Sequence, residues 1–263
     1  MNIQPLTPSI GARVEGVKLG AMDAETFGQI KAAFLKHCML VFPGQFLQPD
    51  DQLAFARMWG EIAVTPMITY AEGYPGLLQL VNPGKAQAIT ENWHYDSTFI
   101  PAPHALTILA AQQLPPAGGD TMWCNQYLAY EALSDGMKQL LQGVRARFTG
   151  ARIARKTGTA GEPPSALHPI VRTHPETGRK ALFVGHPGDT VPHLEGMTEA
   201  ESRPLLDYLY AHSPSPDRTV RHMWQPGDVV MWDNRCTMHY AVHDYGEATR
   251  NLNRVTVKGT VPV

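Results

Sequence analysis

The feature that most constrains this fold is a series of short apolar runs, most of them bounded by turn-forming residues. The runs, rich in apolar or β-branched side chains, lie at residues 78–81, 106–111, 170–172, 181–184, 229–232 and 255–257. Gly, Pro, Asn or Asp at their ends favours strands separated by turns. Residues 174–178, between two of these runs, are typical of a hairpin connection. Strands this short and numerous predict a β-sandwich or barrel.

Helical periodicity is concentrated in a few places. Phe27, Ile30 and Phe34 recur at helical spacing within residues 23–38, and a strand at 39–42 follows. A second helix is expected at 49–59. Thr198 and Glu201 form a capping-box pattern at the start of a third, over 198–212, and further helix is expected around 126–142. The chain of 263 residues is therefore predicted to be one domain, mainly β with flanking helices.

Residues 150–169 are rich in Gly, Pro, Ala and Thr and have no clean periodicity. A long connection of this kind is typically a lid, a binding loop or a disordered segment. We therefore expect a loop here, which together with residues 64–90 is a candidate to exclude water from a site.

The charge balance argues for a small-molecule substrate. The formal net charge is -2, and no run of five or six like charges is present, so the chain lacks the basic surface typical of nucleic-acid or membrane binding. The N-terminus does not resemble a targeting segment, and no apolar stretch reaches the length of a spanning helix, so we expect a cytoplasmic protein. Its three cysteines lack metal-type spacing and are expected to be buried thiols.

An H-x-D pair, His94 and Asp96, is the first sign of chemistry. On a strand, residues two apart point to the same face, so both side chains can converge on one metal while Tyr95 points away. A second imidazole, His239, follows the turn that ends the run at 229–232. Two imidazoles and one carboxylate leave positions open on a metal, as non-haem Fe(II) requires. The pair alone is weak, because roughly 0.5 occurrences are expected by chance, and each histidine is equally interpretable as structural.

Two arginines strengthen the metal interpretation. Arg250 and Arg254 are separated by an even number of residues, so on an extended segment both guanidinium groups lie on one face. Guanidinium groups bind carboxylates bidentately, and two of them beside a metal can hold two organic anions. The competing interpretation is a pair of solvated charges on an edge strand.

The order of these motifs resembles the taurine dioxygenase and aryloxyalkanoate dioxygenase family of Fe(II)/2-oxoglutarate oxygenases, over nearly the whole chain. The segments that carry the resemblance are Val-Phe-Pro-Gly-Gln at 41–45, Trp-His-Tyr-Asp-Ser-Thr-Phe at 93–99, Gly-Gly-Asp-Thr at 118–121, Arg-Thr-His-Pro at 172–175, Trp-Asp-Asn-Arg at 232–235 with His239, and Arg250-x3-Arg254.

The resemblance implies a double-stranded β-helix, or jelly roll, with Fe(II), the co-substrate 2-oxoglutarate and O2. His94, Asp96 and His239 match the iron ligands, and Thr121 and Arg250 match the positions that hold the distal carboxylate of 2-oxoglutarate. Arg254 matches the position that contacts the substrate anion. Without the resemblance, Thr121 is simply a turn residue after two glycines. The family's assemblies further imply a homodimer or homotetramer.

The implied reaction is hydroxylation of a small organic anion next to a heteroatom, with release of succinate and CO2. Sulfonates, alkyl sulfates and aryloxyalkanoates all fit. Taurine fits less well, because residues 63–66 replace the H-x-H-P segment of the taurine enzymes and Thr90 replaces an Asn. A larger tail is expected to contact Met67, Ile68 and Tyr70, unless these only pack in the core.

Two other kinds of protein stay open from the residues alone. A zinc-dependent hydrolase uses two His and one carboxylate around an activated water, but leaves Arg250 and Thr121 without a role. A jelly roll that binds 2-oxoglutarate or a metal without catalysis predicts binding and no turnover.

Overall fold

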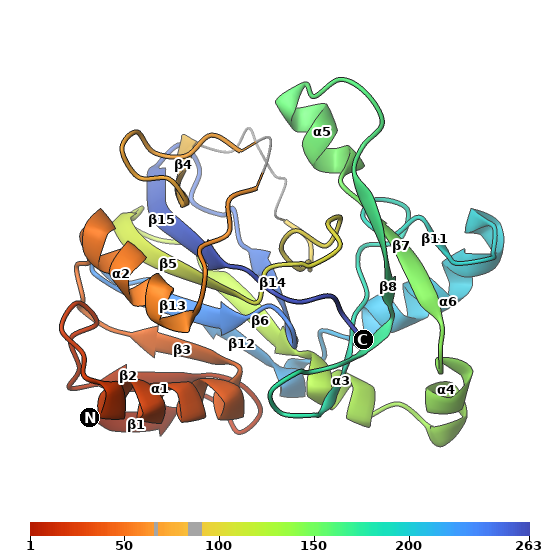
Figure 1. Cartoon of the computed structure of the whole chain (residues 1–263), viewed down its shortest axis with the longest axis horizontal. Coiled ribbons are helices and arrows are strands. Elements are labelled where there is room, and N and C mark those ends of the chain that lie inside the picture. The colour runs from red at the N-terminus through yellow and green to blue at the C-terminus, as the bar shows by residue number, and fades with distance from the viewer. Residues whose placement is uncertain (66–67, 84–90) are drawn as a thin grey trace.

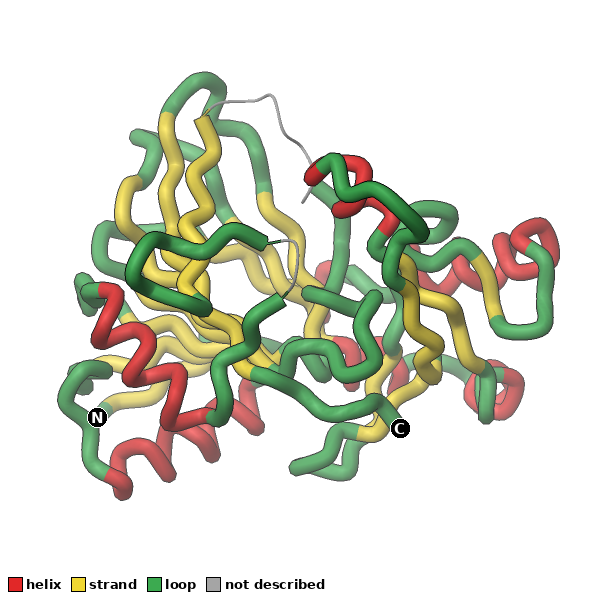
Figure 2. Tube along the Cα trace, turned by 45° about the horizontal axis from the view of Figure 1, so that its top comes forward, coloured by secondary structure: helices red, strands yellow, loops and turns green. Residues whose placement is uncertain are grey.

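The computed structural model describes residues 1–65, 68–83 and 91–263, whose strands form one large sheet and three smaller ones (Figures 1 and 2). The large sheet has seven strands, in which only the second and third are paired in parallel. In spatial order they are β1 (Asn2–Pro5), β2 (Ala12–Glu15), β3 (Met39–Phe42), β13 (Val229–Asp233), β5 (Leu106–Gln113), β15 (Thr249–Val257) and β4 (Leu77–Pro83).

Strands from the two ends of the chain alternate in this sheet. β13 pairs with both β3 and β5, and β5 pairs with β15. In Figure 1 the blue C-terminal strands accordingly lie among orange and yellow-green ones. This interleaving is that of the double-stranded β-helix, and the predicted fold class is confirmed.

The smaller sheets complete the β structure. One contains β12 (Thr219–His222), β6 (Thr121–Asn125) and β14 (Thr237–Ala241). The others contain β11 (His193–Leu194), β7 (Arg145–Thr149) and β8 (Ser165–Pro169), and β10 (Lys180–Leu182) and β9 (Val171–Thr173). The two strands of the last pair are joined by the predicted hairpin connection.

The helices lie outside the strands. They are α1 (Ala24–His37), α2 (Pro49–Trp59), α3 (Gln126–Glu131), α4 (Asp135–Leu140), α5 (Ala151–Thr157), α6 (Glu199–His212) and the 3₁₀ turn η1 (Pro216–Arg218). Asp23 caps α1 by accepting from the Thr26 N–H, and both hydrogen bonds of the predicted capping box at Thr198 and Glu201 are formed. The helices expected at the N-terminus and after Thr198 are thus confirmed.

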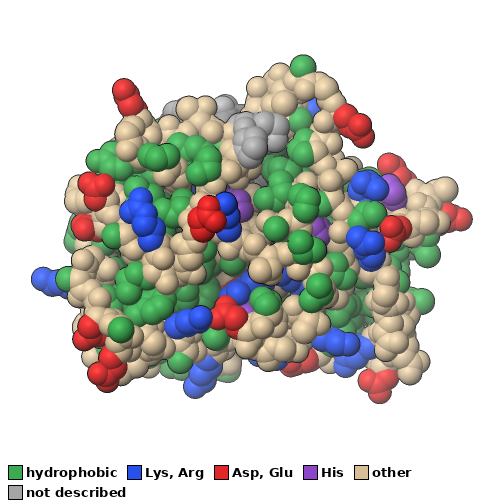
Figure 3. Space-filling view, in the orientation of Figure 1, with side chains coloured by type: hydrophobic (Ala, Val, Ile, Leu, Met, Phe, Trp, Pro, Cys, Tyr) green, Lys and Arg blue, Asp and Glu red, His purple; other side chains and the backbone are tan. Residues whose placement is uncertain are grey.

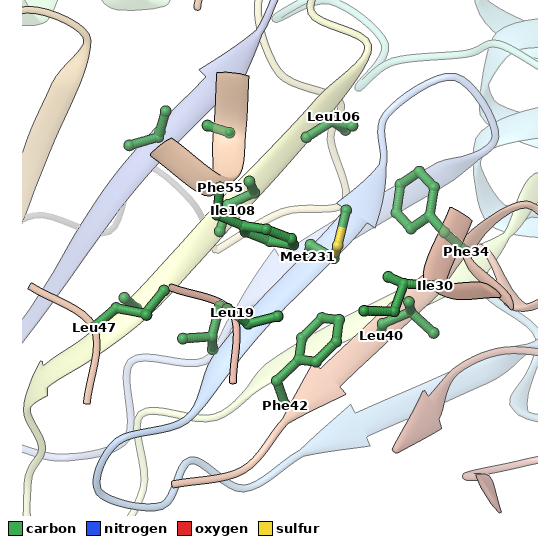
Figure 4. Packing of buried hydrophobic residues seen from close by; sticks show 14 of the residues in the cluster. Leu19, Ile30, Phe34, Leu40, Phe42, Leu47, Phe55, Leu106, Ile108 and Met231 are labelled. Carbon is green, nitrogen blue, oxygen red and sulfur yellow. The ribbon is translucent and has the colours of Figure 1, made fainter. Parts of the chain in front are cut away.

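The central strands are buried on both faces, because their alternate residues enter two different cores. On β13, Met231 joins the cluster under α1 and α2, whereas Trp232 joins the cluster between the large sheet and the β12-β6-β14 sheet. Figure 4 shows the first cluster, in which Phe55 of α2 lies beside Ile108 and Met231, and Phe34 of α1 lies near Ile30. The second cluster occupies the jelly-roll interior. Polar side chains that face it are therefore held within apolar packing.

The same alternation orients β15. Leu252 lies in the interior cluster, so Arg250 and Arg254, each two residues away, face the interior as well. The expectation that both arginines share one face agrees with this register. Gln112 is an extra residue on β5 at a bulge opposite Asn251 and Leu252, so β15 itself stays regular.

The segment 150–169 differs from the expected loop. It contains helix α5 and strand β8, and β8 pairs with β7 along its whole length. The helix has only seven residues and the strand ends in a proline, so neither produces a periodic signal long enough to recognise. The prediction of an unstructured connection was wrong. Residues 66–67 and 84–90, part of the other expected lid, lie outside the described residues.

In the described part of the chain no helix is both long and apolar enough to span a bilayer. On the face drawn in Figure 3, acidic and basic side chains are interspersed. This distribution agrees with the balanced composition.

His104 provides a test of the packing. The side chain is buried next to Thr65, and burial, followed by the charge of Arg254, lowers its pKa from 6.5 to about 4. Because the unfolded chain takes up this proton near pH 6.5 and the folded chain only near pH 4, the residue destabilises the fold as pH falls through this window. For His104→Gln we expect the loss of unfolding free energy between pH 7 and pH 5 to be about 2 kcal/mol smaller than for the unsubstituted protein. Urea denaturation at both pH values measures it, and an equal loss in the two proteins would contradict the assignment.

Candidate metal and co-substrate site

Two reciprocal backbone hydrogen bonds place the two histidines side by side. The His94 N–H donates to the His239 carbonyl over 3.0 Å, and the His239 N–H donates back over 2.9 Å. Their ring centroids are 4.1 Å apart. Tyr95 points away, as expected, and packs against Phe183. Asp96 then follows at the start of a turn in which Ser97 has a positive φ of 54°. The predicted H-x-D pair and the distant His239 are therefore brought together.

One ligand atom from each of these three residues lies within 4.8 Å of the others. His94 Nδ1 donates to the Asn92 carbonyl at 2.8 Å, which leaves Nε2 as the nitrogen with a free lone pair. His239 Nδ1 is buried without a hydrogen-bond partner, and its Nε2 lies 4.0 Å from Asp96 Oδ1, too far for a hydrogen bond. A metal ion between His239 Nε2 and Asp96 Oδ1 fits this separation, whereas it leaves His239 Nδ1 without a partner among the described residues.

The protonation states favour metal binding. Burial lowers the pKa of His94 and, together with the neighbouring His94 ring, that of His239, so both rings are neutral near pH 7. Burial alone would raise the pKa of Asp96, but Arg254, the two histidines and a hydrogen bond from Thr107 hold it well below its ordinary value. The group thus presents two neutral imidazoles and one carboxylate, a combination suited to non-haem Fe(II).

Two residues to which the sequence analysis assigned no role orient the carboxylate. Thr107 donates to Asp96 Oδ2 at 2.7 Å, and Asn234 Nδ2 lies 3.4 Å from the same oxygen. The Asn234 carbonyl oxygen in turn accepts from Trp232 Nε1. Oδ1 is left to face His239 and Arg254, whose Nη2 is 3.0 Å away. Asp96 therefore directs one particular oxygen toward the histidines.

A second cluster with metal-type residues is already satisfied internally. His174, Asp233 and Cys236 lie close together, but Asp233 pairs with Arg235 at 2.7 Å and accepts from His174 Nε2 at 3.0 Å. His174 Nδ1 accepts two backbone N–H groups. Burial raises the pKa of the Cys236 thiol. This buried network joins two of the motifs quoted above and has no place for an ion.

Thr121 and Arg250 also come together, from two different sheets. Arg250 Nε donates to the Gly119 carbonyl at 2.9 Å and Nη2 to Thr121 Oγ1 at 3.3 Å. Trp224 Nε1 donates to the same hydroxyl, and its ring lies under the guanidinium. Gly119 has a φ of +74°, and a Cβ there would be 3.0 Å from the Arg250 side chain.

Arg250 is 4% exposed, and within the described residues no carboxylate lies in ion-pair distance of it. Burial accordingly lowers its pKa. A buried cation without a counter-ion is unfavourable unless an anion binds beside it. The arrangement suits the carboxylate of a small organic acid.

A small cavity of about 150 Å³ adjoins the metal group. Apolar, hydroxyl and cationic side chains line it together with the ligands. The lining comprises Asn92, His94, Tyr95, Asp96, Ser97, Thr98, Phe99, Thr149, Gly150, Arg152, Ile153, Thr190 and Arg254. Ile68 and Tyr70, expected from the sequence as an apolar wall, are not among these described lining residues. Met67 and Thr90 lie outside the described residues.

Residues 2–256 match the family model described as "Taurine catabolism dioxygenase TauD, TfdA family". The chain belongs to the TauD/TfdA family. An alpha-ketoglutarate-dependent sulfate ester dioxygenase of Pseudomonas putida is 36% identical over 282 residues, which cover 100% of this chain and 91% of that protein. An (S)-phenoxypropionate/alpha-ketoglutarate-dioxygenase of Sphingobium herbicidovorans is 34% identical, over 91% of this chain and 88% of its own.

Among solved structures, a taurine dioxygenase from Burkholderia xenovorans has a TM-score of 0.88 and 34% identity, covering 100% of this chain and 92% of its own. TauD/TfdA enzymes are oxidoreductases that use Fe(II), O2 and alpha-ketoglutarate, which is 2-oxoglutarate. The three-residue group and the unpaired Arg250 fit these cofactors.

The support of Asp96 can be tested through metal affinity. In Thr107→Val and Asn234→Ala we expect Fe(II) to bind roughly 10- to 100-fold more weakly, because residues that orient a ligand contribute to metal affinity by about this much. Anaerobic calorimetry measures the dissociation constant. Thr256→Val is a matched control, since Thr256 is the partner of Thr107 across β5 and β15 and makes no described side-chain contact with Asp96. Unchanged affinity in both test variants would show that Asp96 needs no such support.

Proposed function

We propose that this protein is an Fe(II)- and 2-oxoglutarate-dependent dioxygenase that hydroxylates a small organic anion next to a heteroatom. The observation that carries the proposal is the presence, in one jelly-roll interior, of a His-Asp-His group and a buried arginine with no carboxylate of the described residues in ion-pair distance. His94, Asp96 and His239 would hold the metal. Arg250 and Thr121 would hold the distal carboxylate of 2-oxoglutarate.

Iron, 2-oxoglutarate and O2 together supply the oxidation, in which the co-substrate becomes succinate and CO2 and one oxygen atom enters the substrate. The protein binds, orients and excludes water. Asp96 stays ionised because the guanidinium of Arg254 and the hydrogen bond from Thr107 lower its pKa. Trp224 and Gly119 fix the Arg250 guanidinium before the co-substrate arrives.

Arg254 is the proposed contact for the substrate anion. Its guanidinium lines the cavity beside the metal group and is partly exposed, unlike that of Arg250. By their names, the relatives act on sulfate esters and on (S)-phenoxypropionate. Both kinds of compound are organic anions in which one carbon is bonded to an ester or ether oxygen. Hydroxylation of that carbon gives an unstable product that breaks down and releases sulfate or a phenol. We extend this substrate class, including sulfonates, to the present chain.

The two alternatives are less well supported. A zinc hydrolase has no use for the unpaired Arg250, and the named relatives are dioxygenases. A non-catalytic jelly roll would bind 2-oxoglutarate without producing succinate. A cytoplasmic location and a homodimer or homotetramer are further parts of the proposal, and light scattering after size-exclusion chromatography tests the assembly.

Anaerobic spectroscopy tests the reaction type. With Fe(II) and 2-oxoglutarate we expect a visible metal-to-ligand charge-transfer band that is absent in His94→Ala. In Arg250→Met the band should require roughly 10- to 100-fold more 2-oxoglutarate, because a charge-assisted pair with a carboxylate is lost. Arg203→Gln, on the exposed face of α6, is the control. No band at saturating concentrations of both compounds would reject the proposal.

Arg254 should separate substrate binding from co-substrate binding. For Arg254→Gln we expect the charge-transfer band to form, while the KM for an accepted organic anion rises about tenfold or more. Succinate formation over a range of sulfonates, alkyl sulfates and aryloxyalkanoates measures the change. Equal KM values in the variant and the unsubstituted protein would remove Arg254 from the substrate site.

A further inference from the structure

A tight turn forms one wall of the cavity beside the metal group. The turn runs from Asp96 to Phe99, and all four of its residues line the cavity. In Figure 1 the yellow segment that contains the turn lies between the large sheet and strands β7 and β8. The carboxylate of Asp96 is held by Thr107 and Asn234, which do not contact the last two residues of the turn through any described side-chain hydrogen bond.

The backbone of the turn is strained at its second residue. Ser97 has a φ of 54°, in the left-handed region that residues with a Cβ rarely adopt. The Ile100 N–H donates to the Ser97 carbonyl over 3.3 Å, a hydrogen bond longer than the usual range. A strained conformation persists only where the surrounding structure imposes it. A contact from outside the turn is therefore expected to hold its shape.

His168, on β8, makes such a contact. Its Nε2 lies 2.8 Å from the Thr98 carbonyl oxygen, across 70 positions of sequence. A carbonyl oxygen only accepts, so Nε2 is the donor. β8 pairs with β7 along its whole length, and the donor therefore stands on a strand that is itself fixed.

The imidazole of His168 is held in place by aromatic packing. The residue is 1% exposed, and its ring centroid lies 5.3 Å from that of Phe148 and 5.6 Å from that of Phe183. A buried donor that loses its acceptor is unfavourable, because no water replaces the lost hydrogen bond. The ring of His168 and the Thr98 carbonyl thus hold each other in position.

The turn in its present shape places an aromatic ring in the cavity wall. Phe99 is buried, and a Cβ on Gly150 would lie only 3.0 Å from its ring. The ring therefore fits closely against the segment between β7 and α5. Phe99 and Ile153 give the cavity apolar surface, and Arg254 gives it a positive charge. A shift of the turn would change the separation between the apolar wall and this charge.

We propose that His168 is a positioning residue for the substrate. By holding the Thr98 carbonyl, it fixes Phe99 where the apolar part of a small organic anion fits while the anionic head is at Arg254. His168 acts through the turn, since it is not among the described residues that line the cavity. The inference rests on the proposed function for the identity of the substrate site, and it adds a residue to that site.

Amide hydrogen exchange in the full chain tests whether His168 holds the turn. His168→Leu removes the donor and keeps an apolar side chain in the packing, whereas His168→Gln keeps an N–H donor. We expect residues 97–100 to exchange about fivefold faster in His168→Leu, because one hydrogen bond is lost, and within about twofold of the unsubstituted protein in His168→Gln. Exchange in β5 should not change in either variant.

Turnover of hexyl sulfate tests the effect on the substrate, since this probe has an anionic head and an apolar tail. We expect kcat/KM for sulfate release to fall about tenfold in His168→Leu, mainly through KM, and to recover to within about threefold in His168→Gln. The 2-oxoglutarate concentration that gives half of the charge-transfer band should stay within about twofold, because Thr121 and Arg250 lie outside the turn. (S)-2-Phenoxypropionate, with phenol release, is the probe if hexyl sulfate is not turned over.

His193→Leu is the matched control. His193 lies on β11 in the same sheet as β8, and its Nδ1 hydrogen bond is to the carbonyl of the adjacent Leu194. It is not among the described residues that line the cavity, so kcat/KM should stay within about twofold. His168→Met, whose flexible side chain adapts to the space, replaces His168→Leu if that variant does not fold.

Three results would overturn the proposal. They are unchanged or uniformly faster exchange in His168→Leu, equal losses of kcat/KM in His168→Leu and His168→Gln, and a loss of the same size in His193→Leu. The two proposals also fail in different ways. Without a charge-transfer band the dioxygenase function fails, while hydrogen exchange still decides whether His168 holds the turn. With a normal band and an unchanged kcat/KM in His168→Leu, only the assignment of His168 fails.

Discussion

The burial of the central strands on both faces is the constraint from which the site follows. Alternate residues of β5, β13 and β15 serve either the core under the helices or the jelly-roll interior. A polar side chain on the interior face is then surrounded by packed apolar groups and cannot swing away. Thr107 and Arg254 occupy such positions on neighbouring strands. The strands thereby hold rigidly polar and charged side chains that are otherwise unfavourable in an apolar environment.

The two interior arginines have different surroundings. Arg254 stabilises the ionised form of Asp96, while the buried Arg250 is held by a carbonyl, a hydroxyl and the Trp224 ring, all without formal charge. The first arrangement prepares a metal ligand. The second has no described carboxylate within ion-pair distance of the guanidinium, so the two ends of the site differ in how their charges are balanced.

The residue pairs whose shared direction could be predicted from sequence are those only a few positions apart on one segment. His94 and Asp96 are two residues apart, and Arg250 and Arg254 are four apart on one strand, so local geometry already relates them. Asn234 reaches Asp96 across 138 positions of sequence, and no periodicity encodes that contact. The mainly β class with flanking helices followed from the strand pattern, and the double-stranded β-helix followed from the family resemblance. Helix α5 was missed, since seven residues without a clear apolar stripe resemble a loop.

The separation between the strands that hold the metal group and the helix that carries Arg152 has an evolutionary consequence. Substitutions in α5 alter one wall of the cavity and leave the pairing of β14 with β6 and of β15 with β5 intact. Related oxygenases can therefore change their substrate through substitutions in this seven-residue helix, while the metal-binding residues stay the same. This separation agrees with the names of two relatives, each about one-third identical to this chain, which refer to sulfate esters in one case and to (S)-phenoxypropionate in the other.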